Sequence, residues 1–498
     1  MKKLKLFSAV MFSTACLFSC TDGNELLQAE QNSAVTRSAS NSDVVLQWNN
    51  EEQTVDGFGI AQAGWSTYLY AHRKRNELMD IFFGQDGLRL SILRGEVFPH
   101  YDPTTFNMDE NIDQPLDDPF FDIDYDAAGN EAADVIAKHH GQLWVTKKAK
   151  LEYKVDKLVF AVWTPPASMK SNGSTTDGYL KLGSYGAFAN YLSDFCDAFD
   201  RAGLPIYAIS PANEPEYAFP WNSCKWLPGT TTLGPFIVNN LGPKLKVTHP
   251  STKIMFGENG QWTGILGFIM GSKNYVRDIL NVNTRITNFP LIATGHGYND
   301  PITKKELPIV PFDKAESKGI PVWQTEISDP YESYDVTMKS GLKWARIFHQ
   351  YLCEANVGAI IWWAGALPDG GSTEGLINID KNRVDYEVSK RCEVFGNFSR
   401  YIPVNSKRIS AQYNPDKGYM VSGYKHGKSY TAVAINPSDN EVSITLTLDN
   451  ALVNGTLQGY VTDETRKWEA IEAIQPSGNV YTLTLPARSV VSYVGSVQ

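Results

Sequence analysis

The stretch Ile206-Tyr-Ala-Ile-Ser210 is a short apolar run that leads directly into Pro-Ala-Asn-Glu-Pro-Glu-Tyr217. Similar apolar runs recur between residues 54 and 400, and they alternate with longer amphipathic segments such as 185–202 and 334–355. We predict eight strands in this region: Val55–Ile60, Leu88–Leu93, Leu158–Trp163, Ile206–Ser210, Lys253–Gly257, Leu291–Thr294, Pro321–Thr325 and Gly358–Trp362. Eight strands that alternate with helices predict an α/β protein with a closed (β/α)8 barrel, the TIM barrel.

The pattern changes after this region. Segments such as Tyr430–Ile435 and Val442–Leu448 are short and β-branched, and turn residues separate them, as in 436–440. This pattern predicts a C-terminal antiparallel β-sandwich side domain over residues 405–498, next to a catalytic barrel over residues 54–404. A strand at 44–53 precedes the barrel and is expected to join the sandwich.

Composition excludes several classes of protein. Hydrophobic residues make up 42% of the 498 residues and charged residues only 20%, which excludes a disordered chain. The net charge of −10 offers no basic surface for phosphates, so we expect no nucleic-acid partner. No Cys-x-x-Cys pair occurs, so a zinc knuckle or a thiol redox site is not expected. Four cysteines follow residue 20, and the sequence leaves their pairing open: Cys196, Cys224, Cys353 and Cys392.

The first residues have the features of an export signal. A basic head, Met1-Lys-Lys-Leu-Lys5, precedes an apolar run from Leu6 to Ser19, which is too short to span a membrane as a helix. The ending Leu17-Phe-Ser-Cys20 resembles a bacterial lipobox. We therefore predict a lipoprotein signal peptide at 1–19, lipidation of Cys20 and a flexible tether at 20–43. The predicted location is the outer membrane or cell surface through a lipid anchor; an ordinary cleaved signal, with a periplasmic or secreted product, is the alternative.

Two carboxylates follow predicted strands of the barrel. Glu214 comes just after the fourth strand and Glu326 just after the seventh, so both are expected at the rim where barrel enzymes have their active sites. Paired carboxylates catalyse glycoside hydrolysis, and a separation of about 5 Å selects the retaining route by double displacement. Such a site acts on a polysaccharide or oligosaccharide, and it requires no metal and no organic cofactor.

Six segments of the barrel region carry distinctive motifs: Val55-Asp-Gly-Phe-Gly59, Gly87-Leu-Arg-Leu-Ser-Ile92, Val162-Trp-Thr-Pro-Pro166, Met169-Lys-Ser-Asn-Gly173, Asn213-Glu-Pro215 and Trp323-Gln-Thr-Glu326. A seventh, Leu485-Pro-Ala-Arg-Ser489, lies in the predicted side domain. Together these motifs make the chain similar to glycoside hydrolase family 30 over nearly its whole length, and the seventh resembles the last strand of the side sandwich in that family. The resemblance implies a general acid/base at Glu214 and a nucleophile at Glu326.

The same resemblance implies a set of substrate-binding residues. Asn213 would bind the hydroxyl next to the anomeric carbon, and Glu96 would bind sugar hydroxyls. Arg89 would lie beneath the nucleophile and keep it ionised. The remaining matching positions are Trp163 and Trp363 as walls of the cleavage subsite, Tyr298 as a hydrogen-bond donor to Glu326, and His296.

Each of these residues also has a structural explanation. Arg89 could be an ion-pair partner in the barrel floor, and the two tryptophans could be packing residues. His296 lies between two glycines and could cap a loop. Glu216 and Tyr217 follow the acid/base closely, and they are further candidates for substrate contacts.

The substrate is less clearly indicated. The runs 169–178 and 185–192, together with Gln324, look most like the endo-β-1,6-galactanase-like branch of the family. Arg391 resembles a uronate-binding arginine of the xylanase branch. Glu393, however, stands where that branch has a tyrosine, and a second negative charge would repel a uronate.

Other functions remain open. Within the family, an endo-xylanase or a β-1,6-glucanase is the alternative. An exo-acting enzyme would need a closed pocket, and the long insertion Phe98–Lys138 could close one end of the site. A catalytically silent, surface glycan-binding lipoprotein is an alternative of another class, but it predicts an altered catalytic glutamate, and both glutamates are present.

Overall fold

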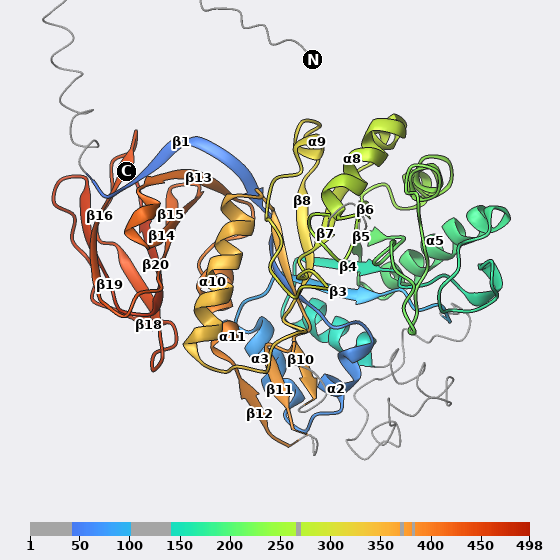
Figure 1. Cartoon of the computed structure of the whole chain (residues 1–498). Helices are drawn as coiled ribbons and strands as arrows, with labels where there is room; N and C mark the ends of the chain where they lie inside the picture. The colour runs from blue at the N-terminus through green and yellow to red at the C-terminus, as the bar shows by residue number, and fades with distance from the viewer. Residues whose placement is uncertain (1–41, 101–140, 265–269, 369–372, 381–383) are drawn as a thin grey trace, which may run out of the picture. The chain divides into compact units, whose positions relative to one another are not determined.

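Eight parallel strands close into a barrel, and this confirms the predicted fold class (Figure 1). In the computed structural model these strands are β2 (Gly57–Ala61), β3 (Ile92–Glu96), β4 (Lys157–Ala161), β5 (Ile206–Ser210), β6 (Lys253–Phe256), β7 (Leu291–His296), β8 (Val322–Ile327) and β9 (Ala359–Trp363). β2 pairs with both β3 and β9, which closes the ring.

The structure describes residues 42–100, 141–264, 270–368, 373–380 and 384–498. Residues 43–498 form a single folded unit. The predicted signal peptide, Cys20 and nearly all of the tether lie outside the described residues, as does most of the insertion Phe98–Lys138.

Helices and short turns connect the barrel strands. The α-helices are α2 (Ser66–Tyr70), α3 (Arg75–Phe83), α5 (Tyr185–Arg201), α6 (Leu233–Phe236), α7 (Gly242–Thr248), α8 (Ser272–Val282), α9 (Asp313–Glu316), α10 (Met338–Cys353) and α11 (Lys390–Ser399). A small sheet of β10 (Ala366–Pro368), β11 (Ile377–Ile379) and β12 (Tyr386–Val388) follows β9. In the described part of the chain, no helix is both long enough and apolar enough to span a membrane.

Buried apolar side chains fill the inside of the barrel. This inner cluster is Ala61, Ile92, Val159, Ala208, Met255, Ile292, Trp323, Ala359 and Ile361. Side chains along a strand alternate between its two faces, so the residue two positions after an inner residue also points inward unless the strand is interrupted. The inner cluster therefore determines which residues reach the rim.

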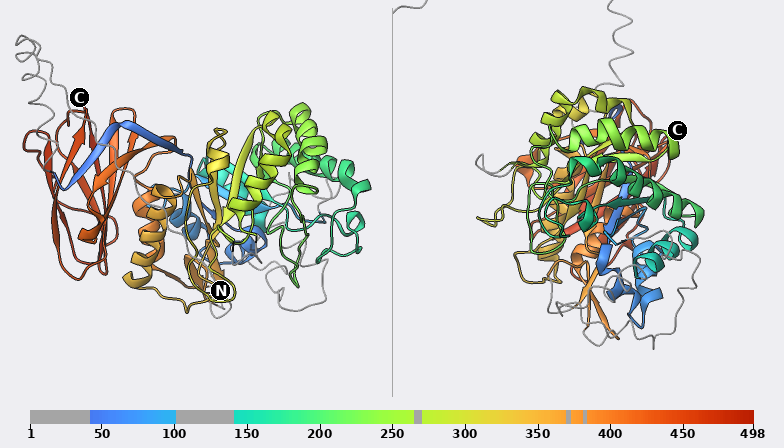
Figure 2. Two further views of the ribbon diagram at one scale, coloured as in Figure 1. Left: turned by 45° about the horizontal axis from the view of Figure 1, so that its top comes forward. Right: turned by 90° about the vertical axis from the view of Figure 1, so that its right-hand side faces the viewer.

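The second sheet has nine strands, and most of its pairs are antiparallel. Its strands are β1 (Val44–Val55), β13 (Ser406–Tyr413), β14 (Met420–His426), β15 (Ser429–Asn436), β16 (Val442–Asp449), β17 (Gln458–Thr462), β18 (Glu469–Ala470), β19 (Val480–Leu485) and β20 (Ser489–Ser496). β1 lies between β13 and β16; it is antiparallel to the first and parallel to the second (Figure 2). The N-terminal strand thus belongs to the C-terminal sheet.

Helix α11 packs directly on β17 and β20 of the second sheet. Asn397 Nδ2 donates to the carbonyl oxygens of Tyr460 and Val490, and Ser492 Oγ donates to the Asn397 carbonyl. Trp468 lies against Gly396, where a Cβ atom would be only 2.2 Å from the indole ring. The barrel and the sheet are therefore joined through specific polar contacts and close packing.

We expect the Gly396→Ala variant to lose about 1–3 kcal/mol of unfolding free energy, because the added methyl group overlaps a half-buried tryptophan. Thermal unfolding measures this loss as a lower Tm. Gly186 in α5 is the matched control, because nothing lies within 4 Å of an added Cβ there. Gly186→Ala is expected to be as stable as the parent or slightly more stable. Equal Tm values for the two variants would contradict the account of this interface.

All four described cysteines are free thiols. Cys196, Cys224 and Cys392 are buried, and Cys353 is partly buried.

Candidate active site

Strand alternation brings two of the candidate residues, His296 and Trp363, to the inner face of the barrel, together with Arg94, which the sequence did not single out. Ile92 points inward on β3, and Arg94 follows two positions later. By the same spacing, His296 follows the inner residue Ile292 on β7 by four positions. Trp363 packs against the inner cluster at the end of β9. The sequence pattern of each strand therefore places these side chains at the carboxyl end of the barrel.

Glu326 reaches the same face through an irregularity in β8. Gly295 pairs with Gln324, but the next residue, His296, pairs with Glu326, so β8 has one extra residue at this point. Such a bulge redirects the side chains that follow it. Thr325 and Glu326 consequently both reach the site, although they are adjacent in sequence. Thr325 Oγ1 donates to Glu258 Oε1 (2.9 Å). Glu326 Oε1 accepts the hydroxyl proton of Tyr298 (2.8 Å).

Two further glutamates stand on the loops that follow β5 and β6. Glu214 has a φ of 46° and Glu258 a φ of 57°, both in the left-handed region that non-glycine residues rarely adopt. The Glu214 amide donates to the Glu258 carbonyl (2.9 Å), so the two strained turns support each other. Backbone strain of this kind costs about 1–3 kcal/mol and is concentrated at functional sites.

His296 brings the carboxylates together. Its Nδ1 lies 3.4 Å from Glu214 Oε1 and 3.6 Å from Glu326 Oε1, and its Nε2 lies 3.3 Å from Glu258 Oε2. One oxygen of Glu214 and one of Glu326 are within 4.8 Å of each other. The imidazole is fully buried, and the exposed fractions of the Glu214 and Glu326 side chains are 12% and 6%. Two close carboxylates therefore share a nearly dry site with one histidine.

Arg94 is the cation beneath the nucleophile candidate, and it is fully buried. Its Nη1 donates to Glu326 Oε2 (2.6 Å), and its Nη2 donates to Glu258 Oε2 (2.8 Å) and to Asn213 Oδ1 (2.6 Å). One guanidinium thus orients both carboxylates and the Asn213 amide.

The prediction for Arg89 is wrong. Arg89 is exposed, and its Nε donates to the Gln85 carbonyl (2.6 Å). It precedes β3, which starts at Ile92 rather than at Leu88, so Arg89 lies at the opposite end of the strand from the rim. The position expected of Arg89, beneath Glu326, is occupied by Arg94, five residues later.

The other predicted residues lie around this centre. Asn213 is buried beside Arg94, and Glu96 is buried at the end of β3, where its backbone is bound by the Gln142 side chain. Trp163 and Trp363 are half-buried, with ring centroids 5.9 Å apart, and the Arg94 guanidinium lies 5.0 Å from the centre of the Trp163 ring. These two rings are therefore partly exposed at the rim, and Trp363 also packs against the inner cluster of the barrel.

Burial and nearby charges shift the pKa values of two carboxyl groups, Glu214 and Glu258, in opposite directions. Burial raises the pKa of Glu214, and the negative charge of Glu326 adds to this rise, although His296 and Arg94 act in the opposite direction. Burial alone would also raise the pKa of Glu258, but Arg94 and His296 lower it to about 2. Burial would lower the pKa of His296, yet the surrounding carboxylates raise it to about 10. At neutral pH the imidazole is therefore a cation.

Sequence reasoning missed Glu258. It binds both Arg94 and His296, and it follows β6 just as Glu214 follows β5. The signal was available in Phe256-Gly-Glu258, because an acidic residue one glycine after a strand of the barrel is expected at the rim.

Glu216 has a different environment from the one expected. It was a candidate for a substrate contact, but its Oε1 accepts a hydrogen bond from the Gly260 amide (2.8 Å). Burial and the charge of neighbouring Glu214 raise the pKa of Glu216 to about 8.

Glu214, His296 and Glu326 also have the spacing of a metal site, and among the described residues they are the one group that does. Neighbouring side chains of the protein already contact these groups: Glu326 accepts from Arg94 and Tyr298, and His296 Nε2 lies 3.3 Å from Glu258 Oε2.

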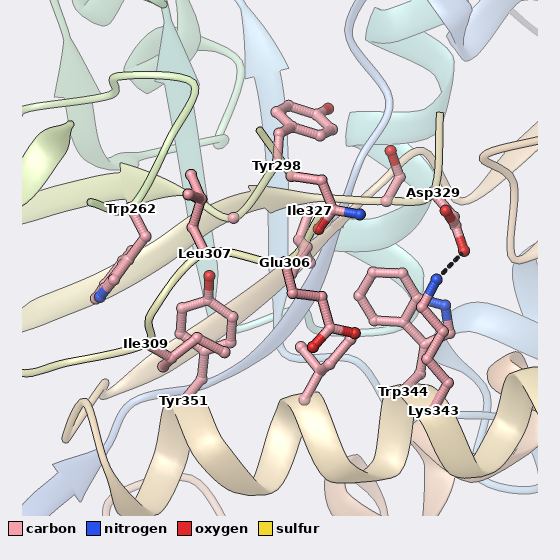
Figure 3. Close-up of a pocket in the computed structure, with 14 residues that line it drawn as sticks. Trp262, Tyr298, Glu306, Leu307, Ile309, Ile327, Asp329, Lys343, Trp344 and Tyr351 are labelled. Atoms are coloured by element: carbon pink, nitrogen blue, oxygen red, sulfur yellow. Dashed lines mark hydrogen bonds and ion pairs between the residues drawn. The ribbon is translucent and has the colours of Figure 1, made fainter. Parts of the chain in front are cut away.

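A hollow lies between β8 and α10 (Figure 3). Its lining includes Trp262, Tyr298 and Tyr351, and an ion pair between Lys343 and Asp329 (2.7 Å) crosses one side. Tyr298 donates to Glu326, but neither Glu214 nor Glu326 lines the hollow, which therefore adjoins the two candidate carboxylates without containing them.

Comparisons with known proteins agree with this arrangement. A model of O-glycosyl hydrolase family 30 matches residues 125–370. A glucuronoxylanase of Bacillus subtilis (strain 168) is 26% identical over 461 residues, which cover 91% of this chain and 92% of that protein.

Solved structures match the fold over the same extent. A family 30 subfamily 8 xylanase from Clostridium acetobutylicum has a TM-score of 0.71 at 24% identity, covering 91% of this chain and 99% of that one. An endo-β1,6-glucanase has a TM-score of 0.66 at 20% identity, covering 92% and 94%. At these identities the solved structures support the fold alone.

A barrel that presents two close carboxylates at its rim defines the class of the O-glycosyl hydrolases. Within that class, the chain is similar to glycoside hydrolase family 30, whose model matches residues 125–370.

Proposed function

We propose that this enzyme is a retaining endo-β-glycanase in which Glu214 is the general acid/base and Glu326 is the nucleophile. The observation that carries the proposal is the short separation of the two carboxylates, with oxygens within 4.8 Å of each other. Retaining enzymes have carboxyl groups about 5–5.5 Å apart, whereas inverting enzymes leave about 6.5–9.5 Å for a water molecule.

The first chemical step needs a charged nucleophile and a protonated acid. A Glu326 oxygen attacks the anomeric carbon while the bond to the leaving oxygen breaks, and Glu214 gives its proton to that oxygen. Arg94 and Tyr298 each donate to one oxygen of Glu326, which fixes the direction of the attacking carboxylate.

The second step reverses the proton transfer. Once Glu326 is esterified, its negative charge disappears, and Glu214 loses the neighbour that raised its pKa. Glu214 then takes a proton from water, the water oxygen bonds to the anomeric carbon, and Glu326 leaves as a carboxylate. The Asn213 amide, fixed by Arg94, is suitably placed to donate to the neighbouring sugar hydroxyl.

The raised pKa of Glu214 predicts the alkaline limit of activity. The acid form of Glu214 persists above the ordinary value of 4.5, so kcat/KM is expected to stay high above that pH and to fall as the pH rises through the raised pKa. A pH profile of kcat/KM on an unactivated oligosaccharide, whose leaving oxygen needs a proton, measures this fall. The Glu214→Ala variant should lack the alkaline limb, and an unchanged limb in that variant would mean that another group titrates there.

The substrate proposed is a neutral β-linked glycan, with β-1,6-galactan as the first candidate on the strength of the runs 169–178 and 185–192. Gln324 is also part of that resemblance, but its side chain is buried and accepts from the Ile361 amide (3.3 Å), so any effect of Gln324 on the substrate is indirect. The similarity to a glucuronoxylanase over most of the chain favours xylan as the second candidate. Endo action rests on the activities named for the relatives.

Arg391 argues against a uronate-directed mode of xylan binding. It is buried, and its Nη2 donates to the carbonyl oxygens of Thr373 and Gly375. Its guanidinium also lies over Trp362 and Tyr334, at 5.2 and 4.9 Å from the ring centres. Arg391, which resembled a uronate-binding arginine, is thus bound to the backbone. The two cations of the candidate active site, Arg94 and His296, are already paired with carboxylates of the protein.

Reducing-sugar release from a panel of polymers tests the proposal. The panel contains β-1,6-galactan, β-1,6-glucan, arabinoxylan and glucuronoxylan, with Glu326→Gln as the inactive control. We expect a neutral polymer to be cleaved into oligosaccharides by the parent enzyme alone. Cleavage of glucuronoxylan without cleavage of unsubstituted xylan would refute the neutral substrate, and release of single sugars only would refute endo action.

We also propose that the enzyme is anchored to the cell surface by a lipid on Cys20, because the segment 1–20 combines a basic head, an apolar run and a lipobox-like ending. Metabolic labelling with a tagged fatty acid tests this proposal. Label on the parent protein and none on the Cys20→Ala variant is the expected result; equal labelling of both would contradict it.

A further inference from the structure

The loops that follow β5 and β6 run side by side at the rim. The Glu214 amide donates to the Glu258 carbonyl (2.9 Å), and Glu216 Oε1 accepts from the Gly260 amide (2.8 Å). The next residue, Tyr217, donates its hydroxyl proton to Gln261 Oε1. Residues 214–217 are thus joined to residues 258–261 by three successive contacts, two of which are made by side chains.

Gly260 lies directly against the carboxyl of Glu214. A Cβ atom on Gly260 would be 2.8 Å from Glu214 Oε1 and 3.1 Å from Tyr217 Cε2, so only a glycine leaves room for the acid in its present position. The Gly260 carbonyl accepts from the Tyr298 amide (3.2 Å), and Tyr298 holds Glu326. Gly260 therefore lies between Glu214, the proposed proton donor, and Tyr298, which orients the nucleophile Glu326.

The Glu216 side chain is costly for the fold. Its Oε2 is buried and has no hydrogen-bond partner among the described residues. A buried polar atom without a partner costs about 1–3 kcal/mol, so stability alone does not account for a carboxyl at this position. The contact that this side chain does make is the one to Gly260.

We propose that Glu216 is a positioning residue, which holds Gly260 against Glu214 and so fixes the acid/base carboxyl beside the leaving oxygen; this inference rests on the proposed function of Glu214. A displaced acid protonates poorly, and the loss appears only with leaving groups that need a proton. A 2,4-dinitrophenolate leaves without one, whereas a sugar alkoxide does not.

The test compares kcat/KM for a 2,4-dinitrophenyl β-glycoside with kcat/KM for an unactivated oligosaccharide of the same sugar. For Glu216→Ala we expect a fall of about 10- to 100-fold on the oligosaccharide and less than about threefold on the aryl glycoside. Glu216→Gln keeps an acceptor oxygen for the Gly260 amide, so it should recover most of the loss. Equal losses on both substrates, no loss at all, or failure of glutamine to rescue the rate would overturn the proposal.

Two further variants keep the test decisive. Glu214→Ala sets the reference pattern: if it does not lose more on the oligosaccharide than on the aryl glycoside, the proposed function of Glu214 fails, independently of Glu216. If Glu216→Ala does not fold, Gly260→Ala replaces it, because the added methyl group displaces the Glu214 carboxyl directly. Gly260→Ala is expected to show the same substrate-dependent loss, and equal activity on both substrates relative to the parent would reject the inference.

Discussion

Replacing Glu326 with glutamine is expected to lower kcat/KM on every substrate by about 10⁴-fold or more, because the variant has no nucleophile to form the glycosyl ester. The loss should not come from unfolding. The glutamine keeps one oxygen that can accept from Arg94 or Tyr298, which now donate to the two Glu326 oxygens at 2.6 and 2.8 Å. Steady-state kinetics and thermal unfolding of the same preparation separate the two effects.

A surface glutamate provides the control for this prediction. Glu472 is exposed and lies on the second sheet domain, so Glu472→Gln should retain parental kinetics. Retention of more than about one per cent of parental activity by Glu326→Gln would contradict its assignment as the nucleophile. In Glu326→Ala, added azide is expected to attack the anomeric carbon of an activated β-glycoside and give the α-glycosyl azide.

The second large effect is expected at Arg94. Arg94→Met removes the guanidinium that binds Glu326, Glu258 and Asn213. Two buried carboxylates thereby lose their positively charged partner. Breaking a buried ion pair by removing one partner costs about 3–5 kcal/mol. We expect a loss of that size in denaturant unfolding, together with a fall in kcat/KM of at least about 100-fold, since the nucleophile loses its orientation and its counter-charge.

Arg89→Met is the matched control. Arg89 has an exposed side chain whose hydrogen bond goes to the Gln85 carbonyl, so its replacement should change stability by less than about 0.5 kcal/mol and leave activity unchanged. If Arg89→Met were as damaging as Arg94→Met, the placement of the two arginines would be wrong.

The sequence predicted the barrel well because its strands are short apolar runs separated by amphipathic segments. The predicted and observed bounds of the fourth strand agree at Ile206–Ser210. For the second strand, the prediction covered Leu88–Leu93, whereas β3 spans Ile92–Glu96. Leu88 and Leu90 are buried outside the strand, so burial alone could not locate its start. The prediction of Arg89 came instead from the resemblance of Gly87-Leu-Arg-Leu-Ser-Ile92 to the family motif, whereas Arg94 lies on β3 itself.

The parts of the site that escaped prediction depend on local backbone geometry. The bulge in β8 brings Glu326 inward beside Thr325, and simple alternation along the strand does not predict it. The left-handed turns at Glu214 and Glu258 likewise carry no signal in a single sequence, since glycine is the residue that usually marks such a turn. Long-range contacts determine these conformations, as in the bond from the Glu214 amide to the Glu258 carbonyl.

The sequence around His296 does not predict the contacts that this histidine makes. A histidine between Gly295 and Gly297 is compatible with a simple loop cap. Its function depends on three carboxylates from three other loops and strands, which lie 3.3–3.6 Å from its ring nitrogens. Only the closed barrel brings these groups together, and their charges turn a neutral side chain into a cation.

The central claim is that Glu214 and Glu326 act together by double displacement with net retention. Proton NMR of the first products of hydrolysis tests it most directly, because the anomeric proton of the newly formed reducing end is observed before mutarotation. The account predicts that the β-anomer appears first and that the α-anomer grows in later. Initial release of the α-anomer would show inversion, and it would contradict the mechanism derived from the short separation of the two carboxylates.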